Sequence, residues 1–154
     1  MIRKLAALAL AFSLATGTAF AASSGGGSSA KAKNPDMAEA KRLIKQEQYA
    51  AALPLLQRVV AKENENADAW NLIGFSHRSM KRYDDALDGY SKALAINPRH
   101  TDAIEYLGEL YLELGDLAQA EAQLEKLDDI CFFGCKQYDM LKSSIAEYKQ
   151  TRGS

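Results

Sequence analysis

The sequence predicts an all-α protein, a solenoid of three helix–turn–helix repeats closed by a C-terminal capping helix. Three observations support this fold class. From Asn34 onward the chain is rich in Ala, Leu, Glu and Lys at helical spacing, and no stretch alternates polar with apolar residues as a strand does. The sequence also matches itself when it is shifted by 34 residues. Finally, glycine and proline are rare in this part and punctuate the apolar segments.

The first residues have the layout of a secretory signal peptide. Met1–Lys4 is a short basic start, an apolar run follows over Leu5–Leu14, and residues 19–21 form the Ala-Phe-Ala pattern that a signal peptidase cleaves. A membrane anchor is the alternative, but Ser, Thr and Gly dilute the apolar run. We therefore expect residues 1–21 to be removed on export to the periplasm, with secretion from the cell as the second possibility.

Residues 22–33 are predicted to be a flexible linker, because Gly and Ser at this density cannot bury a core. The chain has 19 basic and 20 acidic residues. Removing Arg3 and Lys4 leaves 19 − 2 = 17 basic residues against 20 acidic ones, a formal charge of −3. This balance gives no electrostatic reason to expect nucleic acid or an anionic membrane as a partner. No other stretch is apolar enough to predict stable membrane insertion after cleavage.

Five columns of small or apolar residues align at the 34-residue offset. They are Ala40/Gly74/Gly108, Tyr49/Tyr83/Leu117, Ala52/Ala86/Ala120, Leu56/Tyr90/Leu124 and Val59/Ala93/Leu127. Small residues allow the two helices of a pair to approach closely, and bulky residues fill the space between them. A helix pair alone leaves one apolar face bare, so each pair must pack on the next one.

The middle repeat, Ala67–His100, resembles the consensus of the tetratricopeptide-repeat (TPR) family at Trp70, Ile73-Gly74, Tyr83, Ala86, Tyr90, Ala93 and Pro98. The third repeat, 101–134, matches at Leu107-Gly108, Tyr111, Leu117, Ala120, Leu124 and Leu127. The first repeat, 33–66, is the weakest, with Asp36 and Glu39 where apolar residues are expected. The resemblance implies a TPR domain over 34–150 that binds a protein or peptide partner in a concave groove.

We expect paired helices at 35–47 and 49–62, at 67–80 and 83–96, and at 101–114 and 117–130. Thr101 is a predicted N-cap for the fifth helix. A capping helix is expected over 136–150, where spacings of three and four give one apolar stripe. The stripe consists of Tyr138, Leu141, Ile145 and Tyr148.

Cys131 and Cys135 are the only cysteines, and they stand where the last repeat meets the capping helix. In an oxidising compartment such a pair is readily bridged, and the disulfide would fix the angle at which the cap enters. A redox dithiol is an alternative, although the spacing is C-x-x-x-C. A metal site is another, although two thiols half-coordinate a tetrahedral ion. A Cys pair followed by Tyr and Leu is similar to a feature of some short exported bacterial TPR proteins.

The sequence indicates no enzyme and no cofactor. No serine is placed to pair with a histidine and an aspartate, and no glycine-rich phosphate loop occurs. His77 lies on the inward side of its predicted helix, where a packing role is commoner than a ligand or base role.

In the TPR family the first helix of each repeat lines the groove. The predicted groove residues here are Lys41, Lys45, Asn71, Phe75, Arg78, Glu105, Glu109 and Glu113. The three glutamates step by four and predict an acidic ridge, so the groove would be basic at one end and acidic at the other. Asn71 would hold a peptide backbone. The alternative is an ordinary solvated helix face.

The sequence thus predicts a periplasmic adaptor that binds a polypeptide. Some TPR proteins bind a C-terminal carboxylate with a Lys/Asn clamp, and the acidic third repeat departs from that pattern. The alternative function is thiol redox or metal handling by Cys131 and Cys135. Self-association through the two exposed end faces is a further prediction.

Overall fold

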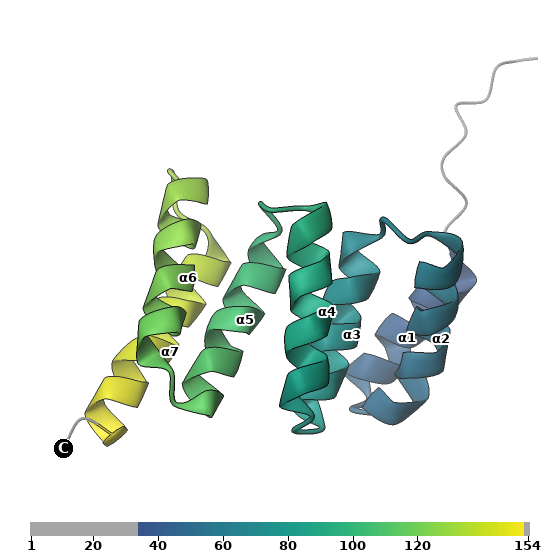
Figure 1. Cartoon of the computed structure of the whole chain (residues 1–154), viewed down its shortest axis with the longest axis horizontal. Coiled ribbons are helices and arrows are strands. Elements are labelled where there is room, and N and C mark those ends of the chain that lie inside the picture. Colours follow the sequence, from purple (N-terminus) through teal and green to yellow (C-terminus); the bar gives the residue numbers. More distant parts are fainter. Residues whose placement is uncertain (1–33, 153–154) are drawn as a thin grey trace, which may run out of the picture. The chain divides into compact units, whose positions relative to one another are not determined.

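The computed structural model describes residues 34–152, and the predicted signal peptide and linker lie outside this range. Within it no strand occurs, and the all-α prediction is confirmed. Successive helices follow one another across the array (Figure 1). They are α1 (Pro35–Lys45), α2 (Tyr49–Lys62), α3 (Ala67–Ser79), α4 (Tyr83–Ile96), α5 (Thr101–Leu114), α6 (Leu117–Ile130) and α7 (Lys136–Arg152). None of these helices is both long and apolar enough to cross a bilayer.

Each helical hairpin turns through one residue in the left-handed conformation. These residues are Glu47 (φ 59°), Lys81 (φ 60°) and Gly115 (φ 83°). In each turn the next amide donates to a carbonyl five residues earlier, which satisfies a helix end. The donor–acceptor pairs are Gln48–Leu43 and Arg82–His77, both at 2.9 Å, and Asp116–Tyr111 at 2.8 Å. Because of these turns α1 ends at Lys45 and α3 at Ser79, so the predicted ends at 47 and 80 are wrong. Helix α7 runs past the predicted 150 to Arg152.

Helices α1, α3, α5 and α6 begin with a side-chain cap, and the caps of α3 and α5 stand at the same position of successive repeats. The Asn66 carboxamide oxygen accepts from the Ala69 amide at 3.0 Å, and His100 Nδ1 accepts from the Ala103 amide at 3.3 Å. The prediction that Thr101 caps α5 is therefore wrong. Thr101 is already the first helical residue, and the imidazole of the residue before it satisfies the free amide. Histidine is an uncommon N-cap, whereas threonine is a preferred one, so residue preferences alone favour Thr101.

Helices α3 and α4 of the middle hairpin approach each other backbone to backbone. A Cβ atom at Gly89 would stand 2.6 Å from the backbone nitrogen and 2.7 Å from the Cα of Gly74. A Cβ atom at Gly74 would stand 2.7 Å from the ring of Tyr90. Gly108 lies under Leu141 of the capping helix in the same way. The predicted column of small residues therefore does bring helices together, and Gly89 adds a second small residue that the alignment did not single out.

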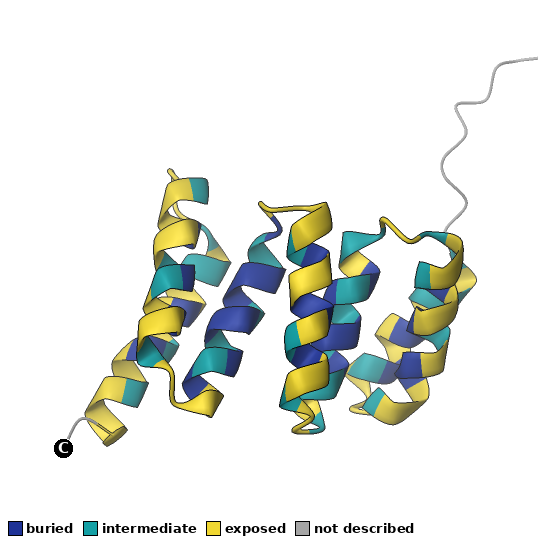
Figure 2. Ribbon diagram, in the orientation of Figure 1, coloured by how far each residue is buried: buried dark blue, intermediate teal, exposed yellow. Residues whose placement is uncertain are grey.

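The apolar core is divided among neighbouring hairpins. One cluster joins α1, α2 and α3 around Leu56 and Ile73. A second joins α4 and α5 around Tyr90 and Leu110, and a third joins α5, α6 and α7 around Leu127. Figure 2 shows these buried positions on the sides where helices face one another. In α7 the predicted apolar stripe is confirmed, with two of its residues buried and two partly buried against α5 and α6.

Candidate functional site

The odd-numbered helices form one side of the array. Helix α3 contacts α5, and α5 contacts α7, in addition to the contacts within each hairpin. In Figure 1, α4 and α6 lie in front of α3 and α7. We call the side of α1, α3 and α5 that carries the predicted groove residues the inner surface.

Arg78 forms the centre of the inner surface. Its Nη1 atom lies 2.6 Å from Glu109 Oε2 and 3.3 Å from Glu113 Oε1, so α3 is bound to α5. The Arg78 side chain is only 12% exposed, whereas that of Glu113 is 40% exposed. The acidic end of the predicted groove is therefore weaker than expected, because the single Arg78 charge offsets one of the two glutamate charges.

Aromatic rings surround this ion pair. The Arg78 guanidinium lies 6.0 Å from the Phe75 ring centre and 5.7 Å from that of Tyr106, a cation–π geometry. The Phe75 and Tyr106 rings are 5.1 Å apart. The row continues to Tyr49 of α2, 6.0 Å from Phe75, and to the buried Tyr90 of α4, 6.3 Å from Tyr106. Four helices thus contribute to one continuous aromatic row.

Glu105 is not part of a solvated ridge. The residue is 1% exposed, and its Oε1 atom has no hydrogen-bond partner among the described residues. Burial, reinforced by the Glu109 carboxylate, raises the pKa of Glu105 to about 8. The side chain is therefore mostly protonated at neutral pH. The predicted ridge of three glutamates is wrong, because α5 packs against helices on several sides and encloses this position.

A small polar pocket opens beside the N-terminal ends of α3 and α5. Its volume is about 150 Å³, and its lining is Lys41, Asp68, Asn71, Leu72, His100 and Asp102. Asn71 is 4% exposed, and its Oδ1 atom has no hydrogen-bond partner within the described range. Two predicted groove residues, from different repeats, therefore meet in one pocket. Lys45 is exposed in the last turn of α1 and does not line it.

Several residues of the inner surface and of the aromatic row were missed from the sequence. Tyr106 and Tyr49 were not predicted in the groove, although Tyr49 belongs to one of the aligned columns. Asp68 contacts His100 Nε2 at 3.1 Å, and Asp102 accepts from Gln137 Nε2 of α7 at 2.6 Å. A signal was available, because Asp68 and Asp102 stand exactly one 34-residue repeat apart in the first turns of their helices.

His77 and the cysteines lie apart from the pocket. His77 is largely buried, and burial lowers its pKa despite the nearby Asp85 carboxylate, so the imidazole is neutral at pH 7. This agrees with a packing role. Cys131 and Cys135 are paired across the loop between α6 and α7, with Cα atoms 5.5 Å apart. Among residues 34–152 no cluster of three or more His, Cys, Asp or Glu side chains is arranged to hold a metal ion.

Comparison with protein families identifies the same kind of repeat over most of the described range. Two family models, both described as tetratricopeptide repeat, match residues 77–145 and 37–99. Among curated proteins, superkiller complex protein 3 of Mus musculus is 28% identical over 130 residues, which are 80% of this chain and 8% of that protein. Anaphase-promoting complex subunit 3 of Schizosaccharomyces pombe is 27% identical over 85 residues, 55% of this chain and 13% of that protein. The chain thus spans a small fraction of these relatives.

Solved structures share the fold. The type III secretion translocator chaperone SycD of Yersinia enterocolitica superposes with a TM-score of 0.65 at 19% identity, covering 77% of this chain and 84% of that one. The second TPR domain of human RPAP3, in complex with an HSP70 peptide, gives 0.64 at 20% identity, covering 72% and 92%. SycD in complex with a peptide of the translocator YopD gives 0.65 at 17% identity, covering 75% and 88%.

Proposed function

The chain belongs to the tetratricopeptide-repeat family, and from this we propose that its inner surface binds an extended segment of another polypeptide. TPR proteins are typically scaffolds and adaptors without catalytic activity, and similar folds have been solved with a peptide of HSP70 and a peptide of YopD. The observation that carries the proposal is the cluster of Arg78, Glu109 and Glu113 framed by aromatic rings.

The cluster combines apolar contact area with charges held in place. Partly exposed Phe75 and Tyr106 rings offer flat surface to the side chains of a ligand, at a low cost in conformational entropy. The ion pairs and the cation–π contacts fix the Arg78 side chain before any ligand arrives. A preorganised surface loses less entropy on binding, and this favours affinity. The exposed Glu113 carboxylate is the charge that remains available to the ligand.

The pocket at Asn71 supplies a complementary anchor. A buried carbonyl oxygen without a partner costs free energy that a ligand N–H group would recover. Peptide amides carry such groups at every non-proline residue. Asn71 Oδ1 therefore favours a bound backbone amide, with Lys41 at the rim of the same pocket.

The ligand that we propose is an internal segment of a polypeptide. Asp68 and Asp102 line the same pocket as Lys41 and Asn71, and two carboxylates oppose the entry of a third. A Lys/Asn clamp for a C-terminal carboxylate is disfavoured for the same reason. An internal segment brings amide donors without that charge.

A peptide library displayed with free and with blocked C-termini tests this proposal. We expect the selected peptides to bind equally well in both formats. Asn71→Ala and Glu113→Lys should each weaken binding by about tenfold, the loss of one hydrogen bond or one charge contact. Isothermal titration calorimetry with the selected peptides measures this change.

Glu125→Lys is the matched control, because Glu125 is exposed on α6, outside the inner surface, and the charge change is the same. Circular dichroism checks that each variant remains folded. Unchanged affinity in both inner-surface variants, or binding that requires a free carboxylate, would contradict the proposal.

We also propose that the protein works in the periplasm and that Cys131–Cys135 is a structural disulfide there. The support is the signal-like sequence at 1–21, which the structure does not describe, and the pairing of the two cysteines. N-terminal sequencing of the protein from a periplasmic extract should begin at residue 22. Thiol titration of the same sample should find no free sulfhydryl, and rapid exchange with a thioredoxin-range redox buffer would favour the redox alternative.

A further inference from the structure

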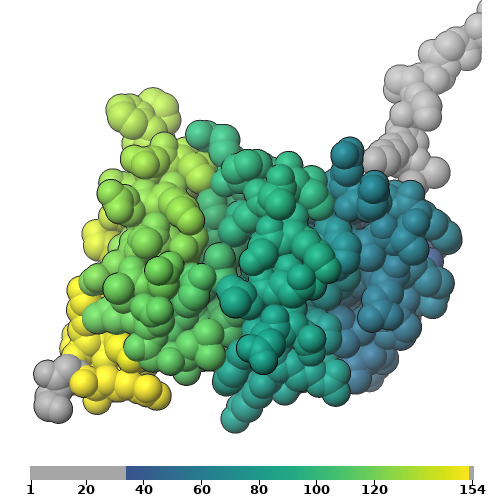
Figure 3. Space-filling view, in the orientation of Figure 1, coloured from purple at the N-terminus to yellow at the C-terminus, as the bar shows by residue number. Residues whose placement is uncertain are grey.

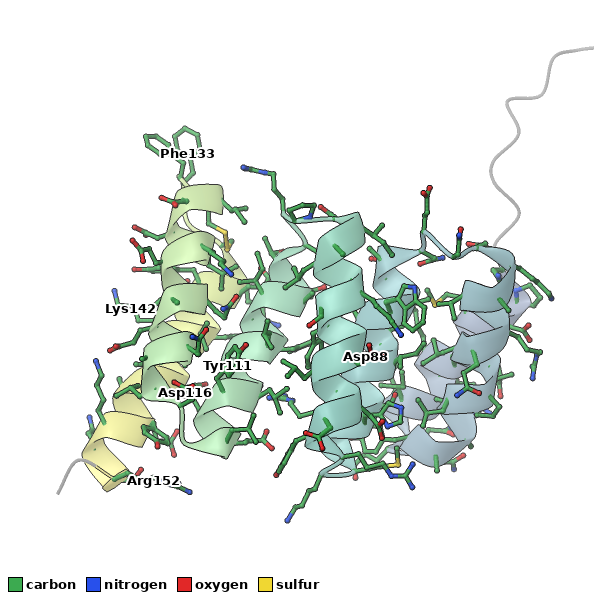
Figure 4. The ribbon with its side chains drawn as sticks, viewed as in Figure 1. Asp88, Tyr111, Asp116, Phe133, Lys142 and Arg152 are labelled. Atoms are coloured by element: carbon green, nitrogen blue, oxygen red, sulfur yellow. A yellow bond between two sulfur atoms is a disulfide. The ribbon has the colours of Figure 1, made fainter. Side chains whose placement is uncertain are left out.

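The loop between α6 and α7 presents two phenylalanines to solvent. Phe132 is 86% exposed and Phe133 is 97% exposed, and their rings make an edge-to-face contact at 5.1 Å. Figure 4 shows Phe133 beyond the end of α6, pointing away from the helices, and Figure 3 shows this part of the chain as a projection. We call the two side chains the aromatic tip.

The inner surface does not use the aromatic tip. Phenylalanine contributes strongly to cores and interfaces, and exposed apolar groups of this size mark sites of contact. The paired cysteines at the two ends of the loop restrict its conformations. The tip is thus preorganised, and a partner that covers it has little loop entropy to overcome.

A complementary pocket lies at the first hairpin turn. Its volume is about 490 Å³, and it is lined by Glu47, Gln48, Tyr49, Ala50, Ala51 and Met80. The walls are mainly a ring, methyl groups and a thioether, and methionine adapts readily to aromatic groups. A pocket of this size is within the range of about 300–1,000 Å³ that holds compact organic ligands, so it can receive phenyl rings.

The charges around the two features are complementary. Asp128 and Asp129 are exposed in the last turn of α6, beside the tip, and Lys136 follows it. Lys81 and Arg82 are exposed next to Met80, and Glu47 lines the pocket. The acidic residues beside the tip can therefore face the basic residues beside the pocket, and Lys136 can face Glu47.

We propose that the Phe132–Phe133 tip of one molecule inserts into the Tyr49–Met80 pocket of a second copy. The tip lies in the last loop of the helix array and the pocket in the first hairpin. A molecule whose tip is inserted in a neighbour still has its own pocket free for the tip of a third molecule. The contact is therefore heterologous, and association can continue without closing into a dimer. Two phenylalanines bury roughly 300–500 Å² on one side. Counted over both partners this is roughly 600–1,000 Å², still below the total of about 1,200–2,000 Å² in stable interfaces, so association is transient and depends on concentration.

Sedimentation equilibrium up to about 1 mM protein tests the contact, because interfaces of this size are at the weak end of the range. The average mass of the wild type should rise with concentration. Phe132→Ser/Phe133→Ser and Ala51→Glu should each remain monomeric. The matched controls are Leu114→Ser, another exposed apolar side chain, and Ala61→Glu, an exposed alanine of α2 outside the pocket. Both controls should associate as the wild type does.

Mixing the two monomeric variants gives the sharper test. The tip-deficient chain keeps a pocket, and the pocket-deficient chain keeps a tip, so an equimolar mixture should form a complex of two chains and nothing larger. Charge reversal extends the test. Asp128→Lys/Asp129→Lys should reduce association, and Lys81→Glu/Arg82→Glu in the second chain should restore it.

Three results would overturn the inference. One is a wild type that stays monomeric at all concentrations, and another is a mixture that forms no complex. The third is a monomeric wild type whose tip is needed for sedimentation with phosphatidylcholine vesicles, which would assign the tip to lipid. The tip variant should bind groove peptides as the wild type does, so failure here is distinguishable from failure of the proposed peptide binding.

Discussion

Replacing Gly89 by alanine should destabilise the middle hairpin, although alanine is the better helix former. In a helix interior, alanine normally gains about 1 kcal/mol over glycine. Here the added Cβ would stand 2.6 Å and 2.7 Å from backbone atoms of Gly74, against 3.4 Å for the start of ordinary contact. The overlaps are 3.4 − 2.6 = 0.8 Å and 3.4 − 2.7 = 0.7 Å, and backbone atoms cannot rotate away.

Helices α3 and α4 must therefore move apart by most of an ångström. A gap of that size forfeits a quarter to a half of the dispersion energy of each contact along the interface. Overpacking of this kind costs typically 1–3 kcal/mol. Because the rigid backbone cannot relax, we place the overpacking cost at or above the upper end of this range, about 3 kcal/mol. Subtracting the gain of about 1 kcal/mol in helix propensity leaves a net loss of stability of about 2 kcal/mol. The midpoint of thermal unfolding should fall by roughly 6–10 °C.

Circular dichroism at 222 nm and urea titration measure this loss. Gly108→Ala is the matched control, because its Cβ would meet only the side chain of Leu141, which can shift. The control should lose clearly less stability than Gly89→Ala. If Gly89→Ala is as stable as the wild type, the backbone contact does not set the helix spacing and the reasoning fails.

Three further predictions concern single side chains. Glu105 binds its proton more tightly in the folded chain than in the unfolded one, so stability falls as pH rises from about 5 to 8. Glu105→Gln should be more stable than the wild type at pH 8, by on the order of 2 kcal/mol, and the gain should vanish near pH 5 in urea titrations. Arg78→Ala removes two ion pairs and leaves the glutamates unpaired, which should cost about 1–3 kcal/mol, whereas exposed Arg82→Ala should change stability by less than about 0.5 kcal/mol. His100→Ala removes the α5 cap and should cost about 1 kcal/mol, while Thr101→Ala should cost less; equal losses would support the threonine cap.

The repeat period was enough to predict the helices and their order. Apolar and small residues recur every 34 positions, and the physical requirement that each hairpin cover its neighbour leaves few alternatives. Helix ends depended on the turn. Glu47 and Lys81 adopt the left-handed conformation without being glycine, so nothing in the residue type announced where α1 and α3 stop.

The depth of the site residues could not be predicted in the same way. Helical periodicity places Glu105 and Glu109 on one face of α5, but it does not give the distance from that face to Arg78 of the preceding repeat. That distance decides which carboxylate reaches Arg78 and which one is enclosed. The ion pair between Arg78 and Glu109 joins two repeats, so it depends on their stacking and is invisible to a reading of either helix alone.

Helix α3, which carries most of the proposed binding cluster, also packs closely against α4. Gly74 lies against the backbone of α4 and against the ring of Tyr90, and three residues of the inner surface, Asn71, Phe75 and Arg78, stand on that same helix α3. A helix held by backbone contact cannot shift without opening its hairpin. The contact between Gly89 and Gly74 therefore also fixes the position of Arg78 relative to α5, although Gly89 does not touch Arg78. This has a consequence for binding. At temperatures where Gly89→Ala is still folded, the variant should bind selected peptides more weakly than Gly108→Ala does, although Gly89 is buried and contributes no side chain to the inner surface.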